Sequence, residues 1–196
     1  MKSIKIAVTG GIGSGKSTAL SIIKDLGYSV VCLDDVYAQL LLEEEFVRLV
    51  SDEMGVLPLI FGGRLTLDRK SISKIVFSDE AMLKKLNKVT HDAIFQRAFS
   101  LADDKIVFYE VPLLFEGDYV HLFDHVFVVL RDYEDRVKSA MARDGLTREE
   151  VELKIKNQVD YDKIDTSKHT VIMNNFGLVE LRQSIIRAIE VVKENI

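Results

Sequence analysis

The chain has 196 residues, of which 47% are hydrophobic and 29% are charged, and its formal net charge is −5. This length allows one well-buried domain with helical insertions, and the composition is ordinary for a soluble globular enzyme. The acidic balance argues against duplex nucleic acid as a partner, and no apolar run approaches the roughly 20 residues that span a bilayer. Because the single cysteine, Cys32, cannot form an internal disulfide, we expect a cytoplasmic protein.

A glycine-rich loop joins the first two predicted elements, a strand over residues 4–8 and a helix over residues 18–26. It reads Gly10-Gly-Ile-Gly-Ser-Gly-Lys-Ser17 and fits the phosphate-binding pattern G-x-x-x-x-G-K-[ST] at every fixed position. Glycine lets backbone N–H groups turn toward a polyphosphate, and the positive end of the helix faces the same anion. Such turns also occur without a ligand, but the Lys-Ser pair at this spacing argues against that alternative. This phosphate loop (residues 10–17) predicts binding of a nucleoside triphosphate.

The loop predicts that the nucleoside triphosphate binds together with Mg²⁺. Lys16 is predicted to reach the β- and γ-phosphates, and the hydroxyl of Ser17 is predicted to bind Mg²⁺. The predicted nucleotide contacts in and beside the loop are Gly11, Gly13, Ser14, Gly15, Lys16, Ser17 and Thr18.

Two adjacent acids, Asp34 and Asp35, follow the second predicted strand (residues 29–33). Ligands collect at the carboxyl ends of strands in open α/β sheets, so one of these acids is placed to orient and deprotonate an acceptor hydroxyl. A helix is predicted to begin near Val36, and an acid at its start also serves as an N-cap. We assign the catalytic role to Asp34 and the cap to Asp35.

A long insertion follows, with amphipathic periodicity over residues 36–50 and, less regularly, over residues 72–99. It is too large for a simple crossover, so residues 36–100 are predicted to form a helical substrate-binding subdomain. Two stretches within it resemble GTPase signatures. Asp52-Glu-Met-Gly55 fits D-x-x-G but follows helical periodicity, and Asn87-Lys-Val-Thr90 has Thr90 where the guanine-reading N-K-x-D needs an acid. We therefore favour a kinase over a GTPase.

Three further β-rich runs cover residues 106–111, 125–130 and 170–173, and an amphipathic helix over residues 178–193 closes the chain. Near-continuous apolar strands that alternate with helices indicate a parallel sheet covered on both faces. The predicted fold class is α/β, a P-loop NTPase fold with a five-stranded parallel sheet, a helical substrate-binding insertion and a helical lid. The predicted core comprises residues 1–35, 101–131 and 161–196.

A charged helical hairpin between the last two strands is the predicted lid (residues 132–160). Its first arm covers residues 133–143, Gly145 breaks it, and Thr147 to Glu150 forms a capping box that opens the second arm. Arg143, at the tip, is predicted to close over the phosphates and neutralise them. The other basic residues are interpreted mostly as a solvated face: Arg136, Lys138, Arg148, Lys154 and Lys156.

Along nearly its whole length the chain resembles the dephospho-coenzyme A kinases, the last enzymes of coenzyme A biosynthesis. The matching residues are Thr9 to Thr18, Leu26-Gly27 leading to Asp34, Leu67-Asp68-Arg69, Val76-Phe77, Leu86-Asn87, His91, Val111-Pro-Leu-Leu-Phe-Glu116, Arg143-Asp144, Gln158 and Asn174. The Val111 to Glu116 segment is the most specific, because other small kinases lack it. The resemblance implies transfer of the ATP γ-phosphate to the 3′-hydroxyl of dephospho-coenzyme A by direct in-line transfer, without a phosphoenzyme.

The resemblance also implies roles for individual residues. Asp34 is similar to the acid beside the acceptor hydroxyl, and Arg69 and Arg143 are similar to the arginines that serve substrate and phosphoryl group. Glu110 matches an acid that acts on Mg²⁺ from the outer shell, although a strand-end charge facing solvent is the alternative.

For His91, packing and substrate contact remain open. Asn174 is placed to line the adenine pocket, or is a turn residue.

The chain departs from the family pattern at Cys32, Asp92, Glu134, Lys154 and Phe176, and none of these positions touches the phosphate loop or the predicted catalytic residues. The expected partner is dephospho-coenzyme A, with no nucleic acid and no membrane, in a monomer or weak homo-oligomer. Two alternatives remain: another P-loop small-molecule or nucleoside monophosphate kinase, and a non-enzymatic nucleotide-dependent switch.

Overall fold

The computed structural model describes residues 3–102, 104–161 and 163–195. The chain divides into two compact units: the first comprises Met1–Val30 and Asp103–Ile196, and the second is Val31–Ala102.

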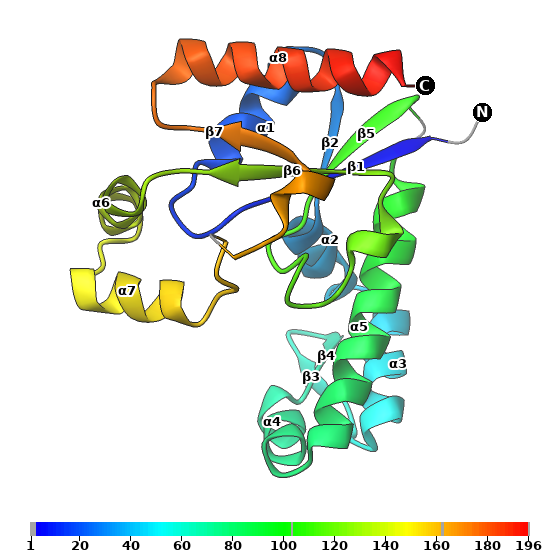
Figure 1. The fold of residues 1–196 in the computed structure, drawn as a ribbon. Coiled ribbons are helices and arrows are strands. Elements are labelled where there is room, and N and C mark those ends of the chain that lie inside the picture. Colours follow the sequence, from blue (N-terminus) through cyan, green and yellow to red (C-terminus); the bar gives the residue numbers. More distant parts are fainter. Residues whose placement is uncertain (1–2, 103, 162, 196) are drawn as a thin grey trace. The chain divides into compact units, whose positions relative to one another are not determined.

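A five-stranded sheet organises the first unit (Figure 1). Its order is β2-β5-β1-β6-β7, and β1 pairs in parallel with both β5 and β6, as β6 does with β7. The strands are β1 (Ile4–Thr9), β2 (Ser29–Cys32), β5 (Ile106–Glu110), β6 (His125–Leu130) and β7 (Thr170–Met173). This architecture confirms the predicted α/β fold with a five-stranded parallel sheet.

Helices α1 (Lys16–Asp25) and α8 (Leu178–Glu194) pack together against the sheet (Figure 1). The strands present apolar side chains such as Ile6, Phe108 and Phe127 to one core, and the helices add Ile23 and Leu181, all of them fully buried. Strands that are apolar along their whole length fit a parallel sheet with no wet face. This packing holds the carboxyl end of β1 and the start of α1 in place.

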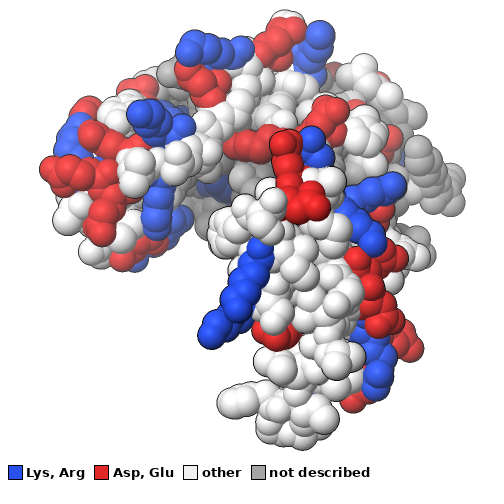
Figure 2. Space-filling view, turned by 90° about the horizontal axis from the view of Figure 1, so that it is seen from below, with Lys and Arg blue, Asp and Glu red and all other residues white. Residues whose placement is uncertain are grey.

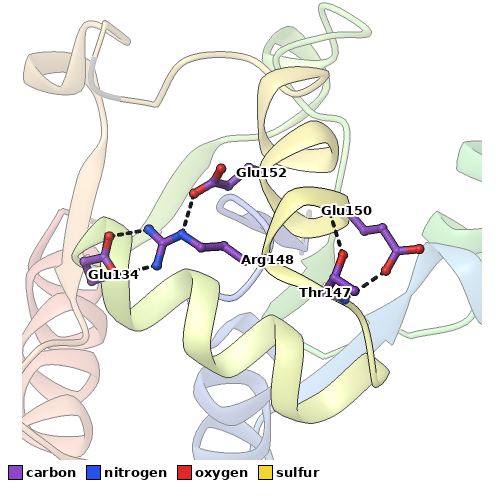
Figure 3. Close-up of polar contacts among 5 residues, drawn as sticks. All are labelled: Glu134, Thr147, Arg148, Glu150 and Glu152. Atoms are coloured by element: carbon purple, nitrogen blue, oxygen red, sulfur yellow. Dashed lines mark hydrogen bonds and ion pairs between the residues drawn. The ribbon is translucent and has the colours of Figure 1, made fainter.

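The predicted lid comprises α6 (Tyr133–Asp144) and α7 (Arg148–Lys156), which pack on each other through Val137, Ala140 and Val151. Figure 3 shows the predicted capping box, in which the Thr147 hydroxyl accepts from the Glu150 N–H and the Glu150 carboxylate accepts from the Thr147 N–H. Two short 3₁₀ helices complete the first unit: η1 (Val120–Leu122) and η2 (Thr166–Lys168).

The lid surface carries charges of both signs. Arg148 bridges the two lid helices by donating to both carboxylate oxygens of Glu134 at 2.6 and 3.1 Å, and it donates to Glu152 at 2.8 Å (Figure 3). Figure 2 shows acidic and basic side chains intermingled at the left of the molecule, where α6 and α7 lie. The interpretation of Arg148 as a solvated, paired residue agrees with these contacts.

The second unit is helical, with one small hairpin. Helices α2, α3 and α4 each pack on the long α5, and the hairpin β3–β4 packs beside α3. Their bounds are α2 (Leu33–Leu40), α3 (Glu44–Met54), β3 (Leu59–Phe61), β4 (Arg64–Thr66), α4 (Arg69–Ser78) and α5 (Glu80–Ser100). A bidentate ion pair from Arg97 on α5 to Glu43, at 2.6 and 2.8 Å, fixes the start of α3.

Several boundaries in the second unit differ from the prediction. The second strand ends at Cys32, and Leu33 already opens α2. Cys32 is therefore the N-cap position, and no side chain makes a capping bond there, so the assignment of a cap to Asp35 was wrong. Asp35 lies inside the first turn of α2, where an acid still interacts favourably with the helix dipole.

Each of the two predicted helical stretches contains two helices. Residues 36–50 fall in α2 and α3, and residues 72–99 fall in α4 and α5, with a turn of the chain between the helices of each pair. The β3–β4 hairpin was not predicted at all. Its turn residues, Gly62 and Gly63, both have positive φ, as a type I′ hairpin turn requires.

Candidate active site

The phosphate loop connects β1 to α1 with three glycines at positive φ. Gly10 has a φ of 153°, Gly13 of 74° and Gly15 of 93°, and Gly15 is the N-cap of α1. The Ser14 N–H donates to the Gly11 carbonyl at 3.1 Å, which closes the loop. The first N–H groups of α1 have no partner within the helix, and such a helix start suits anion binding.

Other segments approach three glycines of the loop closely. A Cβ on Gly11 would overlap the guanidinium of Arg136, and a Cβ on Gly13 would overlap the backbone of the same residue. A Cβ on Gly15 would overlap the side-chain amide of Asn174. The backbone of Arg136 therefore leaves no room for a side chain at Gly13, whereas a Cβ at Gly11 or Gly15 would displace the end of the Arg136 or Asn174 side chain.

Lys16 lies at the centre of a group of charges. Its Nζ donates to the carbonyls of Gly10 at 2.6 Å and Gly11 at 3.4 Å. Burial lowers the pKa of Lys16, the positive charges of Arg143 and Arg136 lower it further, and the negative charges of Glu110 and Glu116 oppose this shift.

Two predicted residues, Glu110 and Arg143, are therefore within electrostatic range of the loop lysine. Arg143 itself is exposed and makes a bidentate ion pair with its neighbour Asp144 at 2.7 and 2.8 Å.

Ile12, at the tip of the loop, is held from two sides. Its N–H donates to Oε1 of Gln158 at 2.8 Å, and its carbonyl accepts from Nε of Arg136 at 3.1 Å. These partners are 146 and 124 residues away in the sequence. Because Arg136 belongs to α6 and Gln158 follows α7, both ends of the lid are attached to the phosphate loop.

Consecutive asparagines after β7 reach both the loop and the lid. The amide of Asn174 donates to the Ser14 carbonyl at 2.9 Å, and the side chain of Asn175 exchanges two hydrogen bonds with Asp132 at the start of α6. Asn174 thus supports the phosphate loop, and its predicted contact with adenine stays a prediction.

The segment from Val111 to Glu116 connects the sheet to the end of the lid. The Val111 N–H donates to the Val8 carbonyl at 3.1 Å, and the Glu116 carboxylate accepts from the Val159 N–H at 3.0 Å. Phe115 packs edge-on against Tyr161, whose buried hydroxyl contacts the Thr9 hydroxyl at 3.2 Å. Burial raises the pKa of Tyr161, which keeps this hydroxyl neutral.

A cavity of about 260 Å³ opens beside the loop, between the ends of β6 and β7 and the start of α6. Gly11 and Ser14 form its loop side, and Arg131, Tyr133 and Met173 line the rest. Two of its polar atoms, the Ser14 hydroxyl and Nε of Arg131, are buried without a hydrogen-bond partner among the described residues. Buried polar atoms of this kind favour a polar ligand.

The predicted acceptor-side residues belong to the second unit. Asp34 is exposed in the first turn of α2, and Arg69 is the first residue of α4. Asp68 is the N-cap of α4, since its carboxylate accepts from the Ser71 N–H at 3.0 Å. His91 is half-buried on α5, and burial lowers its pKa.

The structure brings together the predicted loop residues with Asn174, Glu110 and Arg143. Ser17 and Thr18 are exposed in the first turn of α1. Sequence reasoning missed the loop contact of Arg136, which it had placed on a solvated face, and it missed Asn175 and Tyr161 altogether. Among the residues that the structure describes, no helix is both long and apolar enough to cross a membrane.

The sequence pattern of the dephospho-CoA kinases matches residues 4–180. This chain belongs to the dephospho-CoA kinase family. The Dephospho-CoA kinase of Thermus thermophilus is 34% identical over 191 residues, which cover 95% of this chain and 90% of that protein. The membership confirms the resemblance inferred from the sequence.

Solved structures agree with this family. One from Thermus thermophilus has a TM-score of 0.77 at 32% identity and covers 97% of this chain and 98% of that chain. The dephospho-CoA kinase of Campylobacter jejuni has a TM-score of 0.64 at 28% identity, covering 98% of both chains.

Proposed function

We propose that this chain transfers the γ-phosphoryl group of ATP to the 3′-hydroxyl of dephospho-coenzyme A, giving coenzyme A and ADP. The observation that carries the proposal is the phosphate loop with Lys16 among Glu110, Arg136 and Arg143, in a chain of this family. Phosphoryl transfer depends mainly on positioning and charge stabilisation, which such a cluster supplies.

The donor side is assigned to the first unit. Lys16 and the backbone N–H groups at the start of α1 bind the β- and γ-phosphates. The residues also fit Mg²⁺, because Ser17 offers a hydroxyl and Glu110 a carboxylate whose charge acts on Lys16, and Mg²⁺ prefers oxygen ligands. Bound with the nucleotide, Mg²⁺ would neutralise charge on the phosphate oxygens.

The acceptor side is assigned to the second unit, which we propose binds dephospho-coenzyme A. Asp34 accepts the proton of the 3′-hydroxyl as general base, Arg69 binds a substrate phosphate, and Arg143 of the lid neutralises the transferring group. Transfer is direct and in line. We further propose that the protein is cytoplasmic and acts as a monomer or weak homo-oligomer.

A coupled ADP-release assay tests the proposal, with dephospho-coenzyme A compared against nucleoside monophosphates. We expect turnover with dephospho-coenzyme A to exceed turnover with any monophosphate. Protein that binds ATP but releases no ADP with dephospho-coenzyme A would contradict the proposed reaction. A monophosphate used more efficiently would favour the alternative kinase.

Asp34→Asn and Asp35→Asn form a matched pair for the general base. Both side chains are exposed in the first turn of α2, and both variants remove one charge. We expect Asp34→Asn to lower kcat about 10²- to 10⁴-fold, and Asp35→Asn to leave kcat unchanged. Equal effects of the two substitutions would assign the loss to the helix start rather than to proton transfer.

A further inference from the structure

Arg136 touches the phosphate loop at three consecutive residues. Its guanidinium lies against Gly11, its Nε donates to the Ile12 carbonyl at 3.1 Å, and its backbone lies against Gly13. It also lines the cavity beside the loop together with Gly11 and Ser14. The residue therefore sits on the surface that a polyphosphate in this loop would meet.

Arg136 adds a positive charge to the group around Lys16, in which Glu110 and Glu116 supply the opposing negative charges. Arg136 and Arg143 are seven residues apart on α6, two helical turns, and so project from the same face. Both charges act on Lys16, which is itself partly buried. Like charges held close together raise the energy of a site, and a bound polyanion offsets that cost.

Support of the loop backbone alone does not account for an arginine here. Gln158 holds the other side of Ile12 through a neutral amide, at a comparable distance of 2.8 Å. A neutral donor would serve equally for the Ile12 carbonyl and would not add a cation beside Lys16. The planar guanidinium, in contrast, matches phosphate oxygens in a bidentate geometry.

We propose that Arg136 binds the triphosphate of ATP directly, as a second lid arginine beside Arg143. It differs from Arg143 in that its guanidinium already contacts the loop at Gly11 and Ile12, whereas Arg143 is paired with Asp144. Arg136, near the start of α6, thus increases the affinity for the nucleotide. The inference rests on the proposed use of ATP, and not on the identity of the acceptor.

The test is the affinity for ATP and for AMP, measured by calorimetry at low and high salt without any acceptor. Arg136→Gln removes the charge and keeps an amide donor for Ile12. Gln158→Ala loosens the same residue of the loop without changing any charge. Lys138→Gln removes an exposed cation from the same helix α6 and leaves ATP binding unchanged.

We expect Arg136→Gln to weaken ATP binding about 10- to 100-fold, to weaken AMP binding much less, and to reduce the salt dependence of ATP binding. We expect Gln158→Ala to weaken ATP and AMP binding by similar factors and to keep the wild-type salt dependence. If Arg136→Gln instead behaves like Gln158→Ala in both respects, Arg136 only supports the backbone and the inference is overturned.

Arg136→Lys keeps the test decisive if Arg136→Gln does not fold, as judged by its thermal melt. We expect Arg136→Lys to retain the salt dependence but to lose ATP affinity more than AMP affinity, because lysine lacks the bidentate fork. Equal losses for the two nucleotides would again overturn the inference. Wild-type protein that binds ATP but does not phosphorylate dephospho-coenzyme A would refute the proposed reaction and leave this test intact.

Discussion

The phosphate loop in the first unit and the acceptor-side residues in the second unit are held in very different ways. The loop is fixed by residues more than 120 positions away, from both ends of the lid and from the end of β7. Asp34 and Arg69 instead lie at the starts of their own helices, α2 and α4, with short-range determinants such as the Asp68 cap. The proposed donor side is therefore a packed site, whereas the proposed acceptor side presents its charges on helix ends.

Lys16→Met and Asp34→Asn are expected to have the largest effects on kcat, and they distinguish the proposed donor side from the proposed acceptor side. Lys16→Met removes a cation from the centre of the loop, and we expect a kcat loss of at least about 10²- to 10³-fold together with weaker ATP binding. Asp34→Asn lowers kcat with no change in ATP affinity. Calorimetry with ATP and steady-state turnover distinguish the two, and a loss of ATP affinity in Asp34→Asn would break the division between donor and acceptor sides.

Gly15→Ala tests the packing of the loop, with Gly27→Ala as its control. Both glycines have positive φ, but a Cβ on Gly15 meets the Asn174 amide, while no atom of the described residues lies within 4 Å of a Cβ on Gly27. Backbone strain costs each variant about 1–3 kcal/mol of unfolding free energy, measured by denaturant titration. We expect only Gly15→Ala to weaken ATP binding as well. Equal ATP affinities in the two variants would show that the close approach of Asn174 does not position the loop.

Arg148→Ala addresses the junction of the two lid helices and has a smaller effect. Arg148 joins Glu134 on α6 to Glu152 on α7 (Figure 3). Because the pairs are exposed, we expect a slight decrease in the thermal midpoint that disappears at high salt. Arg148→Lys, which keeps the charge and loses the bidentate geometry, should fall between wild type and Arg148→Ala. A decrease that persists at high salt would indicate packing by the arginine stem instead.

His91 gives the smallest expected effect, as a pH dependence within the second unit. Burial lowers its pKa below the usual value of about 6.5, and the nearby Asp92 only partly opposes this. The unfolded chain then binds more protons than the native state just below about pH 6.5, so stability falls as the pH drops through this window. It stops falling below the native pKa. Denaturant titrations from about pH 7.5 to about pH 5.5 should show a smaller decrease for His91→Asn than for wild type, and equal decreases would contradict a buried neutral imidazole.

Sequence patterns predicted correctly those features whose residues lie close together in the sequence. The phosphate loop motif and the capping box of Thr147 and Glu150 each lie within a few residues, and both formed as predicted. The fold class followed from the alternation of apolar strands with helices. The Gly62-Gly63 hairpin had a readable signal too, since two consecutive glycines between apolar residues favour a tight turn.

The spacing of residues in the sequence did not predict two features, the N-cap of α2 and the contact of Arg136 with the phosphate loop. The cap assigned to Asp35 failed because the apolar Leu33 was counted in the strand, although it is the first residue of α2. The contact of Arg136 with Ile12 joins residues 124 positions apart. In the sequence alone, Arg136 therefore looks like one more basic residue on a solvated face of the helix. Tertiary packing decides such contacts, and a single sequence does not reveal it.

The most direct test of the proposed reaction is identification of the product by phosphorus NMR, after incubation of the protein with ATP, Mg²⁺ and dephospho-coenzyme A. The account predicts a new phosphomonoester signal from a phosphate on the ribose 3′-oxygen, in an amount equal to that of the ADP formed. This signal should be lost in Asp34→Asn but not in Asp35→Asn. ADP formation without a phosphorylated acceptor, or phosphorylation at another oxygen, would contradict it.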